Sequence, residues 1–257
     1  MVGFIDMTNC WPELVLNNFG EAAVNYNKDA QIQQAFASLL AQLCSRESIP
    51  EGLWVDLGSG TGLLAEALET LNPNQSVIRV DGSKKMLAQH PSKCVKQHWD
   101  LNCGLPNWSE RPTLIASNFV LHWLKDPNHR IEEWLAALAP GGRLALAFPV
   151  RGTFQEWHFA ANAAGVNCTA MNFPCHKSLL EALNPKHILY EKTHSFTQQA
   201  SGIRSLLKPI VNVGAHTTTQ AALSIGDWRK LQRAWPSSFC NKELRLTWLI
   251  QVLLLRR

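Results

Sequence analysis

Short apolar runs and amphipathic periods alternate along the first 150 residues of this 257-residue chain. Apolar runs bounded by Gly, Pro, Asn or Asp indicate buried strands, whereas apolar residues three and four positions apart indicate helices. We therefore expect strands at 53–57, 76–80, 94–99, 113–117 and 143–148, and helices at 31–44, 63–71, around 86–87 and at 128–139. Strands separated by helices predict parallel βαβ units with right-handed crossovers, and hence a doubly wound α/β sheet.

The pattern is less regular after residue 150. We expect a helix at 153–164, a strand at 188–196, a helix at 198–207, a loop at 211–219, a helix at 227–235 and a last strand at 244–255. The length suits one α/β domain with an insertion. We expect one domain over 1–257, divided into an N-terminal helical segment (1–50), a cofactor-binding core (51–149), substrate-side, cap-like insertions (150–220) and a closing helix and strand (221–257).

The stretch Asp56-Leu57-Gly58-Ser59-Gly60-Thr61-Gly62 joins the first strand to the next helix. Glycine is needed where the backbone takes positive φ or lies against a ligand, and the amides of the new helix face that ligand. The dinucleotide fingerprint needs its third glycine three places after the second, where this chain has Leu63. Asp56 would repel a pyrophosphate but attract a cationic amino-acid group. The pattern resembles motif I of class I S-adenosylmethionine-dependent methyltransferases; a glycine turn without a ligand is the alternative.

Ligands of such sheets bind beyond the carboxyl ends of the strands. There Asp81 suits ribose hydroxyls, or else caps a helix, and Asp100 with Leu101 suits adenine, or else forms a turn. Met86 would pack on the nucleoside, and Asn118 lies where the amino-acid end of the cofactor meets the substrate. The expected S-adenosylmethionine-binding residues are Asp56, Gly58, Ser59, Gly60, Gly62, Asp81, Gly82, Met86, Asp100, Leu101 and Asn118.

The residues after the fourth strand bear on the methyl acceptor. Amide and amine methylation often uses Asn/Asp-Pro-Pro-Tyr/Phe at this place, which the chain lacks, since it has Ser117-Asn118-Phe119-Val120. Phenol methylation needs a base, for which His122 is the candidate, although a packed histidine is the alternative. A carboxylate is ionised at neutral pH and needs no base, only groups that position it in a partly dry pocket.

Several longer motifs point to a narrower family than the glycine loop does. Ser117-Asn118 precedes His122-Trp123, 150–158 reads Val-Arg-Gly-Thr-Phe-Gln-Glu-Trp-His, and Arg204-Ser205-Leu206 is followed by Lys208 and by Gly214-Ala215-His216. These motifs resemble those of the malonyl-acyl carrier protein O-methyltransferases of biotin synthesis, and the resemblance extends from Tyr26 to the C-terminus. It implies a class I methyltransferase fold and methyl transfer to the free carboxylate of a malonyl group on acyl carrier protein or coenzyme A.

The resemblance also implies substrate-positioning roles. Tyr26 would lie over the cofactor and the substrate carboxylate, and Arg204 and Lys208 would hold the carboxylate or the carrier, unless they are only solvated. His122 and Trp123 are further candidates.

The chain departs from the family pattern in two places. Met171-Asn172-Phe173 stands where the family has Asn-Arg-Phe, so an arginine suited to a carboxylate is absent, and Arg151 is the candidate to replace it. The family's Lys-Gly-Ile-Gly-Ala loop is also longer here, at 208–215, which changes the expected pocket shape.

Charge is unevenly distributed although the net charge is only +4. Residues 1–185 hold 13 Lys and Arg against 17 Asp and Glu, whereas residues 186–257 hold 11 against 3. This asymmetry suits an acidic partner such as acyl carrier protein; a solvated basic face is the alternative.

Composition limits the environment in which the protein is expected to act. The seven cysteines form no Cys-x-x-Cys and no zinc-type spacing with histidine, so we expect reduced thiols and no metal site. The first 18 residues do not resemble a secretory signal, and the longest apolar run, 247–255, is too short to span a bilayer. These features predict a cytoplasmic protein without a membrane partner.

Two further functions stay open at this stage. One is O-methylation of a free small carboxylic acid or a quinone-like phenol. The other is a non-catalytic cofactor- or nucleic-acid-binding module, although the modest net charge and the lack of aromatic-basic repeats argue against nucleic acid. Ten tryptophans are many for a core, so we expect some of them to line a cavity.

Overall fold

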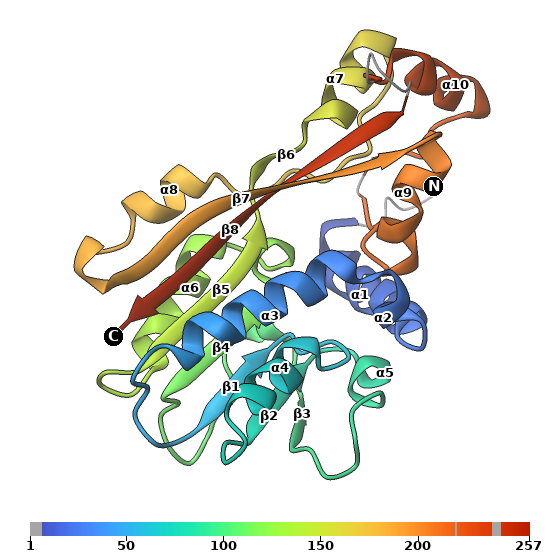
Figure 1. The fold of residues 1–257 in the computed structure, drawn as a ribbon. Helices are drawn as coiled ribbons and strands as arrows, with labels where there is room; N and C mark the ends of the chain where they lie inside the picture. Colours follow the sequence, from blue (N-terminus) through green and yellow to red (C-terminus); the bar gives the residue numbers. More distant parts are fainter. Residues whose placement is uncertain (1–6, 219, 238–242) are drawn as a thin grey trace.

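A seven-stranded sheet forms the centre of the computed structural model, which describes residues 7–218, 220–237 and 243–257 (Figure 1). The strand order is β3-β2-β1-β4-β5-β8-β7. The first five strands pair in parallel, whereas β8 is antiparallel to both β5 and β7. The strands are β1 (Trp54–Leu57), β2 (Val77–Asp81), β3 (Lys96–His98), β4 (Leu114–Asn118), β5 (Arg143–Pro149), β7 (Ile188–Ala200) and β8 (Leu244–Arg256). The predicted mostly parallel, doubly wound sheet is confirmed.

Helices cover both faces of this sheet. Within the described ranges the α-helices are α1 (Met7–Ala22), α2 (Tyr26–Asp29), α3 (Gln31–Ser45), α4 (Leu63–Leu71), α5 (Lys84–Leu87), α6 (Pro127–Ala137), α7 (Gln155–Ala164), α8 (His176–Glu181), α9 (Ile203–Asn212) and α10 (Ile225–Ala234). Short 3-10 turns are η1 (Leu101–Cys103), η2 (Leu121–Trp123) and η3 (Pro185–His187), and a short strand β6 (Arg151–Phe154) follows β5. None of the described helices is long and apolar enough to cross a bilayer.

Successive side chains of β5 point to opposite faces of the sheet, and each face has its own hydrophobic core. Ala145 and Ala147 face the core beneath α3 and α4, whereas Leu144, Leu146 and Phe148 face the core beneath α6 and α8. Every residue of β5 is buried, because helices cover both faces of a parallel sheet. The small alanines leave room for α3 to pack close to the sheet.

The hairpin of β7 and β8 extends past the rest of the sheet and carries α7, α9 and α10 at its far end (Figure 1). We call these three helices, α7, α9 and α10, the cap (Figure 1). Glu156 joins cap and hairpin, since its carboxylate accepts hydrogen bonds from Thr247 N at 3.0 Å and Thr247 Oγ1 at 2.5 Å.

Three sequence predictions in this region were wrong in their boundaries. The strand expected at 188–196 continues to Ala200, because residues 196–200 pair with 248–244 of β8. The helix expected at 198 therefore begins only at Ile203. The helix then continues through Pro209 to Asn212, and its apolar residues Ile203, Leu206, Leu207 and Ile210 share one buried face. The helix expected from 153 is β6 followed by α7. Thr219, the end of the expected loop, lies outside the described residues.

Candidate functional site

The glycine stretch after β1 forms a tight loop bound to the neighbouring strand. The amides of Gly58 and Ser59 both donate to the carbonyl of Val80, at 2.8 and 2.9 Å. Gly58 and Gly60 take φ of +70° and +53°, a region that favours glycine. A Cβ on Gly58 would lie 2.3 Å from Val120 Cγ2, whereas one on Gly60 would meet nothing within 4 Å. Gly58 is therefore required by packing, and Gly60 leaves bare main chain facing open space.

The open space beside Gly60 is a cavity of about 100 Å³ at the carboxyl ends of the parallel strands. We call it the loop cavity. Eight of the predicted cofactor-binding residues line it: Gly58, Gly60, Asp81, Gly82, Met86, Asp100, Leu101 and Asn118. The fold thus brings together segments that are up to 60 residues apart in the sequence, as expected for the ends of adjacent parallel strands.

The acidic groups of the loop cavity are held by backbone amides. Asp81 accepts from Gly60 N at 2.8 Å and from Ser83 N at 2.7 Å, and burial raises the pKa of its carboxyl. Asp100 Oδ1 accepts from the backbone amide and the side-chain amide of Asn102, at 2.9 and 3.0 Å. Asp100 thus forms the turn anticipated as its alternative role, while the residue also lines the cavity.

Three of the predicted residues are not among those that line the loop cavity. Asp56 is 1% exposed, accepts from Ala65 N of α4 at 3.1 Å, and has a pKa that burial raises to about 7. Ser59 lies 3.5 Å from the His90 ring, and Gly62 caps the start of α4, also packed against His90. Asp56, Ser59 and Gly62 thus contact α4 and His90 instead of the loop cavity, and they support the shape of the loop.

Sequence reasoning assigned 1–50 to a helical segment but missed the boundaries of α1 and its position over the loop cavity. Pro12, Val15, Leu16 and Phe19 of this helix line it, and a Cβ on Gly82 would lie 2.7 Å from Leu16. The signal was present, because Trp11, Val15, Leu16 and Phe19 have helical spacing. With α1 in this position the loop cavity is smaller than the roughly 300–1,000 Å³ of ligand pockets.

The residues of the loop cavity fit the expected S-adenosylmethionine. Gly60 offers main chain without a side chain, and Asp81 offers a carboxylate at the end of β2. Asn118 Oδ1 is buried without a hydrogen-bond partner in the described residues, although its Nδ2 donates to Gln33 O at 2.9 Å. Such an oxygen suits the cationic amino-acid end of the cofactor.

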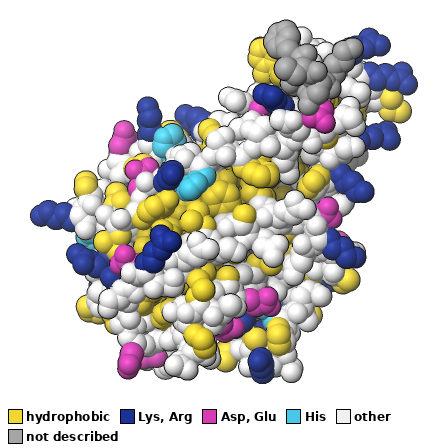
Figure 2. All heavy atoms as spheres, viewed as in Figure 1, with side chains coloured by type: hydrophobic (Ala, Val, Ile, Leu, Met, Phe, Trp, Pro, Cys, Tyr) yellow, Lys and Arg dark blue, Asp and Glu magenta, His cyan; other side chains and the backbone are white. Residues whose placement is uncertain are grey.

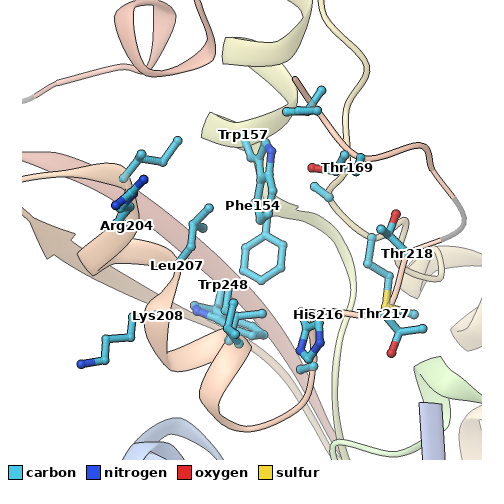
Figure 3. Close-up of a pocket in the computed structure, with 18 of the residues that line it drawn as sticks. Phe154, Trp157, Thr169, Arg204, Leu207, Lys208, His216, Thr217, Thr218 and Trp248 are labelled. Atoms are coloured by element: carbon cyan, nitrogen blue, oxygen red, sulfur yellow. The ribbon is translucent and has the colours of Figure 1, made fainter. Parts of the chain in front are cut away.

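A second and larger cavity lies between the sheet and the cap. We call this space of about 760 Å³ the aromatic cavity (Figure 3). Its walls include Phe154, Trp157, Phe173, Trp228 and Trp248, so the expectation that tryptophans line a cavity is confirmed. Four aromatic residues line both cavities: Phe19, Tyr26, Phe119 and Trp123. These four side chains therefore mark the junction of the two cavities.

Two titratable groups near this junction are poor bases or acids at neutral pH. His122 packs against Trp123, Phe173 and Phe119, with ring centroids 5.0, 5.6 and 6.3 Å away. Burial lowers the pKa of His122 to about 3, so its ring is neutral. Burial also raises the pKa of Tyr26, with a smaller contribution from Asp81.

The cations of the aromatic cavity are on its outer rim. Arg204 and Lys208 of α9 and Arg229 of α10 are exposed, and Figure 3 shows the side chains of Arg204 and Lys208 turned away from the aromatic rings. In Figure 2, Lys and Arg side chains project along the end of the molecule that carries α9 and α10. Arg151 is exposed on β6 and does not line either cavity, so the structure does not bring it to the site.

The segment that departs from the family pattern contributes apolar wall. Met171 and Phe173 line the aromatic cavity, and Phe173 packs against Phe154 with ring centroids 5.5 Å apart. Where the family resemblance led us to expect an arginine, the chain thus contributes uncharged side chains to the cavity wall.

Comparison with known proteins places this geometry in a family. The profile of a family described as "Methyltransferase domain" matches residues 27–186. A malonyl-[acyl-carrier protein] O-methyltransferase of Pseudescherichia vulneris is 29% identical over 229 residues, which are 85% of this chain and 87% of that protein. A trans-aconitate 2-methyltransferase of Variovorax paradoxus is 35% identical over 112 residues, 42% of this chain and 43% of that one.

A solved structure shares the fold. The structure of a putative methyltransferase from Bacillus halodurans superposes with a TM-score of 0.57 at 14% identity, covering 84% of this chain and 97% of the other.

Proposed function

The chain belongs to the methyltransferase domain family and uses S-adenosyl-L-methionine as its methyl donor, and on that premise we propose that it esterifies the free carboxylate of malonyl-acyl carrier protein in biotin biosynthesis. The electron pair of a carboxylate oxygen forms the new O–C bond while the S–C bond breaks and its pair returns to sulfur. No proton moves in this step. The protein has to align the two groups and exclude water.

The observation that carries the choice of a carboxylate is the packing of His122, the histidine expected as a base, among the rings of Trp123, Phe173 and Phe119 near the junction of the cavities. His122 has a pKa of about 3, and the pKa of Tyr26 is raised above its ordinary value. Phenols and alcohols need deprotonation to attack, whereas a carboxylate is already ionised at neutral pH. Within the described residues, this geometry favours the carboxylate over the quinone-like phenol.

The carrier part of the proposal is supported by three features. The aromatic cavity is much larger than a malonyl group and leaves room for the arm that carries it. The exposed cations Arg204, Lys208 and Arg229 surround its rim and suit an acidic carrier protein. The relative named for malonyl-acyl carrier protein matches along most of both chains. A cytoplasmic location is part of the same proposal.

A free small carboxylic acid is the second candidate substrate. It is favoured by the trans-aconitate methyltransferase relative, which has the higher identity over a shorter span. Coenzyme A is the alternative carrier of the malonyl group.

The experiment is methyl transfer from labelled S-adenosylmethionine to malonyl-acyl carrier protein, malonyl-coenzyme A and trans-aconitate, each offered at equal concentration. We expect label on the malonyl carboxylate of the carrier, with the highest kcat/KM of the three. Acetyl-acyl carrier protein, which lacks the carboxylate, is the control and should stay unlabelled. Label on trans-aconitate with none on either malonyl compound would show the second candidate instead.

A further inference from the structure

The methyl-accepting group has to reach the seam between the two cavities. That seam is formed by Phe19, Tyr26, Phe119 and Trp123, which line both spaces. Polar atoms close to the seam and without a partner in the protein are therefore candidates to hold the acceptor.

Gln33 of α3 has such an atom. Its side chain lines the aromatic cavity and is 6% exposed, yet Oε1 is buried without a hydrogen-bond partner in the described part of the chain. The backbone carbonyl of Gln33 accepts from Asn118 Nδ2 at 2.9 Å, and Asn118 lines the loop cavity. This bond holds the residue at the boundary of the two spaces. A buried amide without a partner is costly, so a ligand that completes its hydrogen bonds is favoured there.

His122 is the second neutral polar group in this part of the cavity. Its Nδ1 is buried without a partner among the described residues, and three aromatic rings fix its orientation. The cations that line the cavity, Arg204, Lys208 and Arg229, are all exposed at the rim. In the described residues, hydrogen bonds rather than ion pairs are therefore available where the acceptor has to lie.

We propose that Gln33 binds the methyl-accepting carboxylate through its side-chain amide, with Nδ1 of His122 as the second hydrogen-bonding group. A half-turn of the amide exchanges Oε1 and Nε2, so Gln33 can present its N–H donors to the ligand. A neutral donor orients the carboxylate without pairing its charge, which leaves the attacking oxygen a better nucleophile than it would be beside a guanidinium. These two groups would take the place of the arginine that the family resemblance led us to expect where this chain has Asn172. This assignment rests on the proposed function.

The test measures binding rather than turnover. Protein loaded with S-adenosylhomocysteine is titrated calorimetrically with malonyl-pantetheine and with acetyl-pantetheine, which lacks the carboxylate. The variants are Gln33→Met, which keeps the volume and removes the amide, and Gln34→Met, a matched control because Gln34 is the exposed neighbour on the same helix. The wild-type preference for malonyl over acetyl tests the proposed function, and the loss of that preference in Gln33→Met tests the role of Gln33.

We expect Gln33→Met to bind malonyl-pantetheine about tenfold to hundredfold more weakly, as for a lost hydrogen bond to a charged group. Its affinity for acetyl-pantetheine and for S-adenosylhomocysteine should not change, and Gln34→Met should match the wild type. Equal loss for both pantetheine compounds, or no loss for either, would overturn the assignment.

A second variant keeps the test valid if Gln33→Met folds poorly. Gln33→Glu retains the length and polarity of the side chain but opposes the substrate with a like charge, so it should weaken malonyl binding more than acetyl binding. Normal malonyl binding by this variant would contradict the proposal. A wild type without any preference for malonyl would remove both the proposed function and the role of Gln33.

Discussion

At the scale of single residues, Gly58 and Gly60 are glycines for different reasons. Both have positive φ, but only Gly58 has a neighbour, Val120, in the space that a Cβ would take. Gly60 borders the loop cavity and has no atom within 4 Å of that position. We therefore expect the first glycine to be needed by the fold and the second by the cofactor.

Alanine at each position should separate these two roles. Gly58→Ala should lower the free energy of unfolding by about 3 kcal/mol or more, because strain at positive φ adds to the clash with Val120. Gly60→Ala should cost only the strain, about 1–2 kcal/mol, yet weaken S-adenosylhomocysteine binding at least about tenfold. Urea denaturation and calorimetric titration measure the two effects. Equal destabilisation by the two substitutions would show that Gly60 also packs against the fold.

The buried carboxyl of Asp56 should make the free energy of unfolding depend on pH. Burial raises its pKa from 3.8 to about 7, so the folded protein holds this proton more tightly than the unfolded chain. Its contribution to stability is therefore present below pH 4 and is lost as the pH rises toward 7. Asp56→Asn keeps an acceptor for Ala65 N but cannot ionise.

The comparison of wild type and Asp56→Asn isolates this group from others that titrate in the same range, such as His90, whose pKa burial lowers. Relative to the wild type, the variant should gain stability steadily as the pH is raised from 4 to 7 and stay constant above it. Denaturation curves at a series of pH values measure this difference. A difference that does not vary with pH would mean that Asp56 is already ionised in the folded protein.

At the scale of elements, the cap is attached to the sheet through a long hairpin rather than through the parallel core. Glu156 at the start of α7 accepts two hydrogen bonds from Thr247 of β8. The neighbouring Trp157 packs on Trp235, with ring centroids 6.0 Å apart, and lines the aromatic cavity. The Glu156 carboxylate thus helps to hold this wall, together with the hydrogen bonds between Thr153 Oγ1 and the backbone of Leu249.

Glu156→Ala should loosen the cap without disturbing the loop cavity. Hydrogen exchange should accelerate in 155–164 and 225–234, and affinity for the malonyl substrate should fall about tenfold, since hydrogen bonds to charged groups contribute about 1.5–3 kcal/mol. S-adenosylhomocysteine binding should be unchanged. Glu132→Ala, an exposed residue of α6, is the control and should behave like the wild type. Loss of cofactor binding in Glu156→Ala would mean that the two cavities are not independent.

At the scale of the whole molecule, the excess of positive charge belongs to residues 186–257, which hold 11 Lys and Arg against 3 Asp and Glu. Of these cations, Arg204, Lys208 and Arg229 of α9 and α10 lie at the rim of the aromatic cavity, and Lys and Arg side chains project at that end of the molecule, as they do elsewhere on this face (Figure 2). Such a distribution steers an acidic partner toward the cavity mouth and acts most strongly at low salt.

Charge reversal at the rim should reduce activity on malonyl-acyl carrier protein but not activity on malonyl-pantetheine. The pair Arg204→Glu with Arg229→Glu should lower kcat/KM for malonyl-acyl carrier protein about tenfold or more at low salt, with a smaller effect at high salt. Activity on malonyl-pantetheine should change little. The control is the double variant Lys177→Glu with Lys186→Glu, at exposed positions of α8 and η3. It changes the net charge of the protein by the same amount and should leave both activities unchanged. Equal losses on both substrates would place the arginines at the acceptor instead.

The sequence by itself determined the parallel core, the glycine loop and the side chains at the carboxyl ends of the strands. These follow from local periodicity and from positive φ at Gly58 and Gly60, which depend on neighbours in the chain. Only the tertiary structure decided that α1 closes the loop cavity, that β7 continues to Ala200, and that the buried Gln33 lines the aromatic cavity. Strand pairing and burial of a polar amide depend on contacts between segments far apart in sequence, and no local pattern specifies them.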